Sequence, residues 1–124
     1  MWIPWNPNET RDDGNDCTVR AICKLTGEDW LTVYLGICLE GAMLQAMPST
    51  NFVWGSWLRE RGYVRKSLPD TCPDCLTVRK FCERHPRGRY LLMLPMHVVA
   101  VESGNYYDSW DSGDETASFY WMKG

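Results

Sequence analysis

The chain has 124 residues, of which 44% are hydrophobic, and this apolar content is enough for one compact folded domain. Its net charge is −3, from 13 basic and 16 acidic residues that are mixed along the chain. No basic stripe is available to neutralise a phosphate backbone, so nucleic acid is not expected as a partner. No stretch approaches the roughly 18 consecutive apolar residues of a membrane helix, so no membrane association is expected. We therefore treat residues 1–124 as a single domain.

The first residues lack a basic start followed by an apolar run, so we expect no export signal. Cysteines in such a chain are predicted to be reduced thiols rather than a disulfide framework, and we expect a cytoplasmic location. The six cysteines are Cys17, Cys23, Cys38, Cys72, Cys75 and Cys82.

Apolar residues at helical spacing predict four helices, three of them in the first half of the chain. Glycines mark the expected ends of the first three helices, and Pro86 follows the fourth. The expected ranges are 16–26, 29–41, 51–61 and 77–84. In the second helix the apolar residues that repeat at helical spacing are Leu31, Tyr34, Leu35, Cys38 and Leu39.

The pattern becomes strand-like after residue 88, and the first 15 residues and residues 63–73 are expected to be irregular. Ser103, Gly104 and Asn105 form a turn that joins the second and third strands as a hairpin. The four expected strands are 89–94, 97–102, 106–110 and 117–122. Helices followed by strands predict an α+β fold, with N-terminal helices packed on a small C-terminal antiparallel sheet.

Cys17 is expected in the first turn of the first helix, where unpaired backbone N–H groups and the helix dipole favour negative charge. Such a position lowers the pKa of a thiol and so favours the thiolate, which is the nucleophilic form. The same N–H groups can hold the oxygen that becomes negative when a carbonyl is attacked. A buried structural cysteine is the alternative interpretation.

His97 begins an apolar strand and is the better candidate for a general base, because His85 lies in a polar helix end. With an even number of residues in the hairpin loop, His97 shares a sheet face with Asp108, which would then orient the imidazole. An odd number of loop residues would favour Asp111 instead. The sequence thus predicts a Cys17, His97 and Asp108 triad, with Asp111 as the alternative third member.

Three segments carry a resemblance to known proteins: residues 15–22 around Cys17, residues 88–92, and residues 97–111 with His97 and Asp108. In their chain order these segments resemble the papain-like cysteine peptidase superfamily, in particular small, mostly uncharacterised members from bacteriophages and bacteria. The resemblance implies a helix that carries the nucleophile and packs against a small antiparallel sheet that carries the histidine and the acid. Residues 13–21 also resemble the nucleophile motif of ovarian-tumour-type deubiquitinases, although Asp16 is inserted relative to that motif.

The chain departs from the papain pattern at the oxyanion hole. Papain-like peptidases usually place a Gln about six residues before the cysteine, and Arg11 occupies that position here. Asn15, or less favourably Asn8, would then supply a side-chain amide beside the Cys17 N–H. Cys17 and His97 are also closer in sequence than the roughly 130–150 residues of the plant and lysosomal enzymes, so the substrate cleft of those enzymes is not carried over.

A second cluster, Cys72-x2-Cys75 followed by Cys82-x2-His85, has ligand types and spacings that suit structural zinc. However, Cys82 falls on the apolar side of the predicted helix, which accounts for it without a metal. We expect unligated thiols and assign no metal and no cofactor.

The leading hypothesis is a cysteine hydrolase, a peptidase or isopeptidase, that acts on a protein or peptide substrate through an acyl-enzyme. The alternatives are a papain-like module that binds or inhibits a partner without chemistry, and a small zinc-stabilised interaction domain. The oligomeric state is left open.

Overall fold

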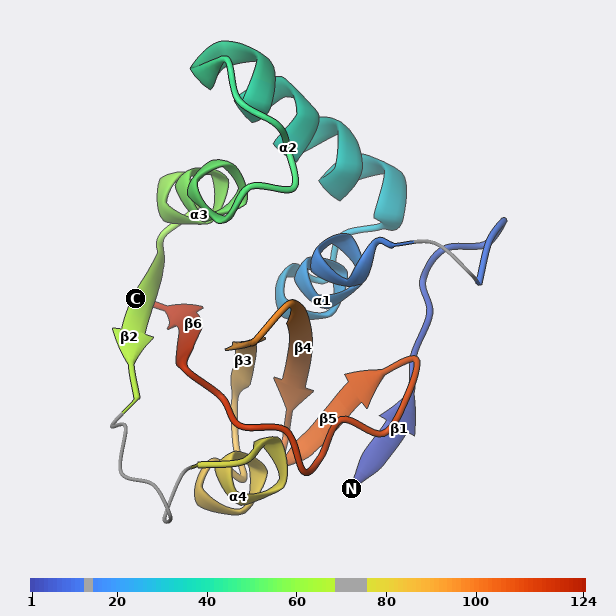
Figure 1. Cartoon of the computed structure of the whole chain (residues 1–124), viewed down its shortest axis with the longest axis vertical. Coiled ribbons are helices and arrows are strands. Elements are labelled where there is room, and N and C mark those ends of the chain that lie inside the picture. Colours follow the sequence, from blue (N-terminus) through green and yellow to red (C-terminus); the bar gives the residue numbers. More distant parts are fainter. Residues whose placement is uncertain (13–14, 69–75) are drawn as a thin grey trace.

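Four helices and six strands make up the computed structural model over the residues it describes, 1–12, 15–68 and 76–124. The helices are α1 (Cys17–Thr26), α2 (Trp30–Leu44), α3 (Asn51–Glu60) and α4 (Val78–Arg84). The strands are β1 (Trp2–Pro4), β2 (Tyr63–Ser67), β3 (Arg89–Leu94), β4 (His97–Glu102), β5 (Asn105–Asp108) and β6 (Phe119–Lys123). The α+β class predicted from the sequence is confirmed, and Figure 1 shows the arrangement.

The second helix was expected to stop near Gly41, and this is wrong, because α2 continues to Leu44 and ends at Gln45 in the left-handed conformation. Gly41 instead allows the backbone of Ala46 to come close to the helix. A Cβ at this position would lie 2.7 Å from the backbone oxygen of Ala46, and the Ala46 N–H donates a hydrogen bond to the Gly41 oxygen. A glycine here lets the chain turn back tightly against the helix.

The sheet is larger than predicted and is mixed rather than antiparallel, with the strand order β1-β5-β4-β3-β6-β2. β1 lies parallel to β5 on one edge, and β2 lies antiparallel to β6 on the other edge. Both edge strands fall in segments that were expected to be irregular. β1 has three residues and includes a proline, and four of the five β2 residues are exposed, so neither shows the alternation that signals a strand.

Side chains of the central strands alternate between two cores. Leu91, Val98 and Ala100 face α1, α2 and α3, whereas Leu92 and Val99 face α4. The sheet is therefore covered by helices on both faces. Trp121 is 2% exposed, so this large side chain anchors β6 in the core.

Two contacts of the sheet position the candidate site. α1 packs on β4, which places the start of the helix beside the sheet. β4 and β5 form a hairpin in which Glu102 pairs with Asn105, so its loop is the two residues Ser103 and Gly104. Both loop residues have positive φ, as a tight hairpin turn of the primed type requires. The even loop length assumed from the sequence is confirmed. Among the described residues, the helices are all too short or too polar to cross a bilayer.

Candidate active site

Cys17 is the first residue of α1, and its thiol is partly exposed. Asp16 precedes the helix without capping it through its side chain, so the first backbone N–H groups of α1 have no cap from that residue. Burial acts to raise the pKa of the Cys17 thiol, but hydrogen bonds from His97, from the Val98 backbone and from the Thr18 hydroxyl outweigh it. The resulting pKa lies below the usual 9.0.

His97 is the first residue of β4, and its side chain is 14% exposed. Its Nε2 lies 2.6 Å from Asp108 Oδ2. Because Asp108 engages Nε2, the ring nitrogen left for the Cys17 sulfur is Nδ1. Burial acts to lower the pKa of His97, but the hydrogen bonds with Asp108 and Cys17 and their negative charges raise it to about 9. The opposite shifts of the two pKa values favour a thiolate and imidazolium pair.

Asp108 ends β5 and is 6% exposed. Besides His97, its carboxylate accepts hydrogen bonds from the Ser112 hydroxyl at 2.6 Å and from the Ser109 N–H at 2.8 Å. Its backbone oxygen accepts from the Trp5 N–H and from the Trp2 indole. The three contacts of the carboxylate orient it toward the imidazole, and the two contacts of the backbone oxygen hold the end of β5 in place.

Asp111 has other partners. It accepts a hydrogen bond from the Tyr106 hydroxyl and one from the Gly113 N–H, and it lies 3.7 Å from Arg79. The structure therefore pairs His97 with Asp108 and not with Asp111, in agreement with the even hairpin loop.

Of the two asparagines considered for the oxyanion hole, Asn15 lines the cleft around Cys17. Asn8 is held in the N-terminal segment instead, where its amide donates to Asp16 and its oxygen accepts from Thr10 and from the Arg11 N–H. Asn15 is thus among the residues that line the cleft with Cys17, and Asn8 is not.

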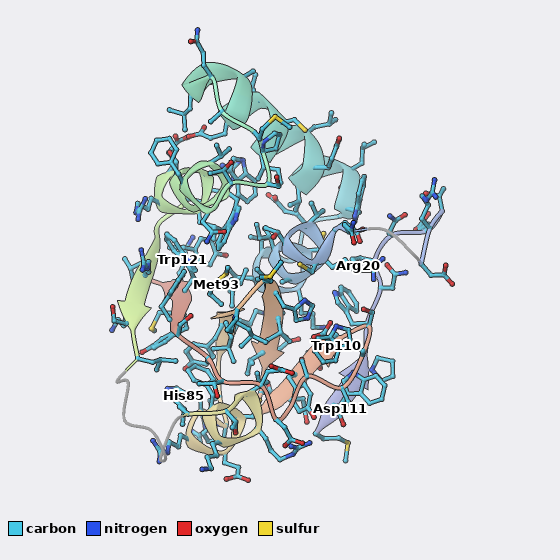
Figure 2. All side chains as sticks on the ribbon, viewed as in Figure 1. Arg20, His85, Met93, Trp110, Asp111 and Trp121 are labelled. Carbon is cyan, nitrogen blue, oxygen red and sulfur yellow. The ribbon has the colours of Figure 1, made fainter. Side chains whose placement is uncertain are left out.

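The cleft has a volume of about 680 Å³ and includes residues that sequence reasoning missed. Ser49 and Asn51, which come just before and at the start of α3, line the same cleft as Cys17 and His97. Trp110 forms a wall, with its ring centroid 5.0 Å from that of His97. The full lining is Asn15, Cys17, Thr18, Arg20, Ser49, Asn51, Met93, Met96, His97, Val98, Ser109 and Trp110. Figure 2 labels three of these residues: Arg20 on α1, Met93 on β3, and Trp110 in the segment that follows β5.

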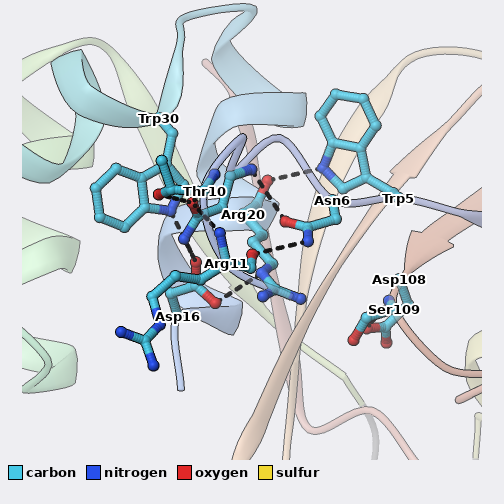
Figure 3. Close-up of polar contacts among 10 residues, drawn as sticks. Trp5, Asn6, Thr10, Arg11, Asp16, Arg20, Trp30, Asp108 and Ser109 are labelled. Carbon is cyan, nitrogen blue, oxygen red and sulfur yellow. Dashed lines mark hydrogen bonds and ion pairs between the residues drawn. The ribbon is translucent and has the colours of Figure 1, made fainter. Parts of the chain in front are cut away.

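A polar network fixes the start of α1 (Figure 3). Asp16 lies 2.6 Å from the Arg20 guanidinium and accepts a hydrogen bond from the Trp30 indole at 2.8 Å. The Trp5 indole donates to the Arg20 backbone oxygen at 3.1 Å. Arg20 is 6% exposed, so this pairing compensates a buried charge one turn from the nucleophile. Nothing in the sequence pattern indicated that Arg20 is buried and not exposed on the surface.

The residues considered for zinc give no site among the described residues. Cys72 and Cys75 lie outside the described residues. The Cys82 thiol is buried, which raises its pKa to about 11. The His85 ring stacks on Phe81 and its Nδ1 lies 2.9 Å from the Phe81 oxygen. In residues 1–12, 15–68 and 76–124, no three metal-ligating side chains are close enough to share an ion.

Comparison of the chain with models of protein families, with curated proteins and with solved structures gave no match. The functional assignment therefore depends on the geometry of the site.

Proposed function

We propose that this protein is a cysteine hydrolase with a papain-like arrangement, which cleaves a peptide or isopeptide bond through a thioester acyl-enzyme. The observation that carries the proposal is the chain of contacts from the Cys17 thiol to the His97 ring and on to the buried carboxylate of Asp108. A thiol, an imidazole and a buried carboxylate in this order are the parts that nucleophilic acyl transfer needs.

In the first half of the proposed reaction, the Cys17 thiolate attacks the carbonyl carbon and the C=O electron pair moves to the oxygen. The Cys17 N–H and the Asn15 side-chain amide hold that negative oxygen. Collapse of the tetrahedral intermediate breaks the C–N bond, and the proton on His97 Nδ1 passes to the leaving amine. A thioester on Cys17 and a neutral imidazole remain.

In the second half, His97 takes a proton from water, and the resulting hydroxide attacks the thioester carbonyl. The C–S bond breaks, the acid product leaves and the thiolate and imidazolium are restored. The Asp108 carboxylate keeps its hydrogen bond to the ring and stabilises the imidazolium.

Two further features support this proposal. The cleft of about 680 Å³ is open to solvent and is lined both by residues of α1 and by residues that follow β5, so a substrate can reach the Cys17 thiol from solvent. Cys17, Cys23, Cys38 and Cys82 are free thiols. A nucleophile that must stay reduced suits the cytoplasm, and we propose that compartment.

The nucleophile is tested with p-nitrophenyl acetate, a simple acyl donor. We expect a burst of nitrophenolate and an acetyl group on the Cys17 peptide by mass spectrometry. The burst should be absent from Cys17→Ala and retained by Cys38→Ser, which removes another partly exposed thiol. A burst that survives in Cys17→Ala would refute the assignment of the nucleophile.

The reaction class is tested by incubating wild type and Cys17→Ala with a proteome-derived peptide library and sequencing new N-termini. We expect new termini with wild type alone. Identical N-termini in both samples would refute cleavage of peptide bonds in this library, and together with the absence of a nitrophenolate burst they would favour a binding or inhibitory module on the same scaffold.

A further inference from the structure

α2 presents an apolar face to solvent instead of to the core. Its buried residues are Val33, Ile37, Glu40 and Gly41, which contact the rest of the helical layer. The opposite face consists of Leu31, Tyr34, Leu35, Cys38, Leu39, Ala42 and Met43, and we call it the outer α2 face. Figure 1 shows α2 on the outside of this layer, with α1 and α3 between it and the sheet.

The large side chains of the outer α2 face are well exposed. Leu31 is 58% exposed, Leu35 57%, Leu39 63% and Met43 70%, and Tyr34 is 42% exposed. A single exposed leucine is ordinary, but a continuous stripe of this length is not. A helix that is apolar on all sides is normally buried on all sides.

No charge interrupts this face. Over Trp30–Leu44, all of which the structure describes, the only charged residue is Glu40, and it is 5% exposed. The Glu40 carboxylate accepts a hydrogen bond from the Ser56 hydroxyl at 2.6 Å on the inner side of the helix. A surface depleted of charge is typical of interfaces between identical subunits.

The shape of the face suits a copy of itself. Leu31, Leu35, Leu39 and Met43 form an i, i+4 ridge along a helix of about 22 Å. Ridges of this kind on two helices interdigitate when the axes cross at about −50°. Contact of this kind about a two-fold axis buries the same patch on both subunits and closes without leaving a free end.

The area is also sufficient. Side chains of this size have roughly 150–200 Å² of accessible surface each, so the five large residues expose about 500 Å² on one copy. Two copies can bury at most about 1,000 Å² from these residues, which is the lower limit of a specific interface, and neighbouring residues add to this area.

Charge argues against a membrane surface as the occupant. Amphipathic helices that bind bilayers carry Lys and Arg beside their apolar face. α2 contains neither, and Glu28 and Asp29 directly precede it. From the absence of charge, the ridge geometry and the area, we infer that the outer α2 face is the interface of a homodimer.

The dimer leaves the proposed active site free, because none of the residues of the outer α2 face lines the cleft. This inference therefore stands or falls separately from the proposed function.

The test is the mass in solution by light scattering coupled to size exclusion, at about 10 to 100 µM full chain. We expect wild type to have twice the 14.4 kDa mass of the chain. A Leu35→Glu, Leu39→Glu double variant should be a monomer, because it places two like charges in the contact. Val64→Glu, which also puts a charge in place of a 40% exposed apolar residue but on β2, should remain a dimer.

Far-UV circular dichroism identifies any variant that has lost its fold. If the glutamate double variant is unfolded, the Leu35→Lys, Leu39→Lys double variant replaces it in the same measurement. A monomeric wild type at about 100 µM overturns the inference. So does a dimer that persists in the folded double variant, because its interface then lies elsewhere. Wild type that is monomeric and floats with phosphatidylcholine vesicles would identify a membrane surface as the occupant and overturn the homodimer.

Discussion

Replacement of Asp108 by asparagine should slow alkylation of Cys17 in a pH-dependent way. The variant keeps the size of the side chain but removes the negative charge that faces His97 at 2.6 Å. Without that charge the imidazolium is less favoured, so the proton returns from the ring to the Cys17 sulfur and the thiolate becomes rarer.

The expected size follows from the pKa of His97, which rises from 6.5 to about 9 in the folded protein. At 1.36 kcal/mol per tenfold change this corresponds to about 3 kcal/mol in favour of the imidazolium. Asp108 and Cys17 share this effect, and solvent screens the partly exposed ring, so we assign about 1.5 kcal/mol to Asp108. The rate with iodoacetamide should therefore fall about tenfold at pH 6.5. Near pH 10 the thiol ionises unaided, and the difference should shrink to about twofold.

The assay is mass spectrometry of the Cys17 peptide after timed exposure to iodoacetamide, with Cys23 as internal reference. Cys23 is 3% exposed, and burial together with nearby carboxylates raises its pKa to about 12, so it should react slowly throughout. Asp111→Asn is the matched control, because that carboxylate lies three residues further on but binds Tyr106. Equal rates for wild type and a folded Asp108→Asn protein at pH 6.5 would refute the ion-pair reasoning, and a loss in Asp111→Asn alone would identify the other acid.

Two predictions concern stability. In Cys17→Ala, we expect Asp108 to keep the pKa of His97 above its usual 6.5. The stabilisation that His97 contributes should then be complete below pH 6.5 and be lost as the pH rises through the folded pKa. The free energy of unfolding of this variant, measured in urea, should fall by about 1 to 2 kcal/mol between pH 6 and 9. It should change less in wild type, because the lowered pKa of Cys17 contributes stability that grows with pH. Parallel pH curves would contradict this. In Gly36→Ala, the new Cβ would lie 2.6 Å from the indole of Trp57, which is 3% exposed. We expect a loss of about 1 to 3 kcal/mol in urea unfolding in spite of the better helix propensity of alanine, and an unchanged midpoint would refute the close contact.

Local periodicity was sufficient for most of the fold. β3 and β4 have the bounds that the sequence predicted, because their side chains alternate between two apolar cores and a turn closes the hairpin. β1 and β2 were missed for a physical reason. An edge strand is stabilised by backbone hydrogen bonds to a neighbour that is distant in the chain, and its exposed side chains carry no burial pattern.

Sequence reasoning identified candidate site residues where side-chain chemistry and the alternation of side chains along a strand distinguish them. It did not identify residues that separate loops bring to the site. The hairpin loop length alone distinguishes Asp108 from Asp111, so sequence reasoning could place the acid. Ser112 donates to Asp108 only because the chain turns back after β5. Ser49 and Asn51 reach the cleft through the packing of α2 and α3, which no local pattern encodes.

α2 shows where periodicity reaches its limit. The residues that repeat from Leu31 to Leu39 identified the helix, and the usual inference is that such a stripe faces the core. Here Val33 and Ile37 on the other side are buried, and the repeating stripe faces solvent. Both sides are apolar, so the pattern signals a helix without saying which side the chain itself covers. The apolar residues on both sides of α2 are explained if a second molecule covers the side that faces solvent. The mass in solution therefore tests this explanation of the α2 sequence as well as the interface.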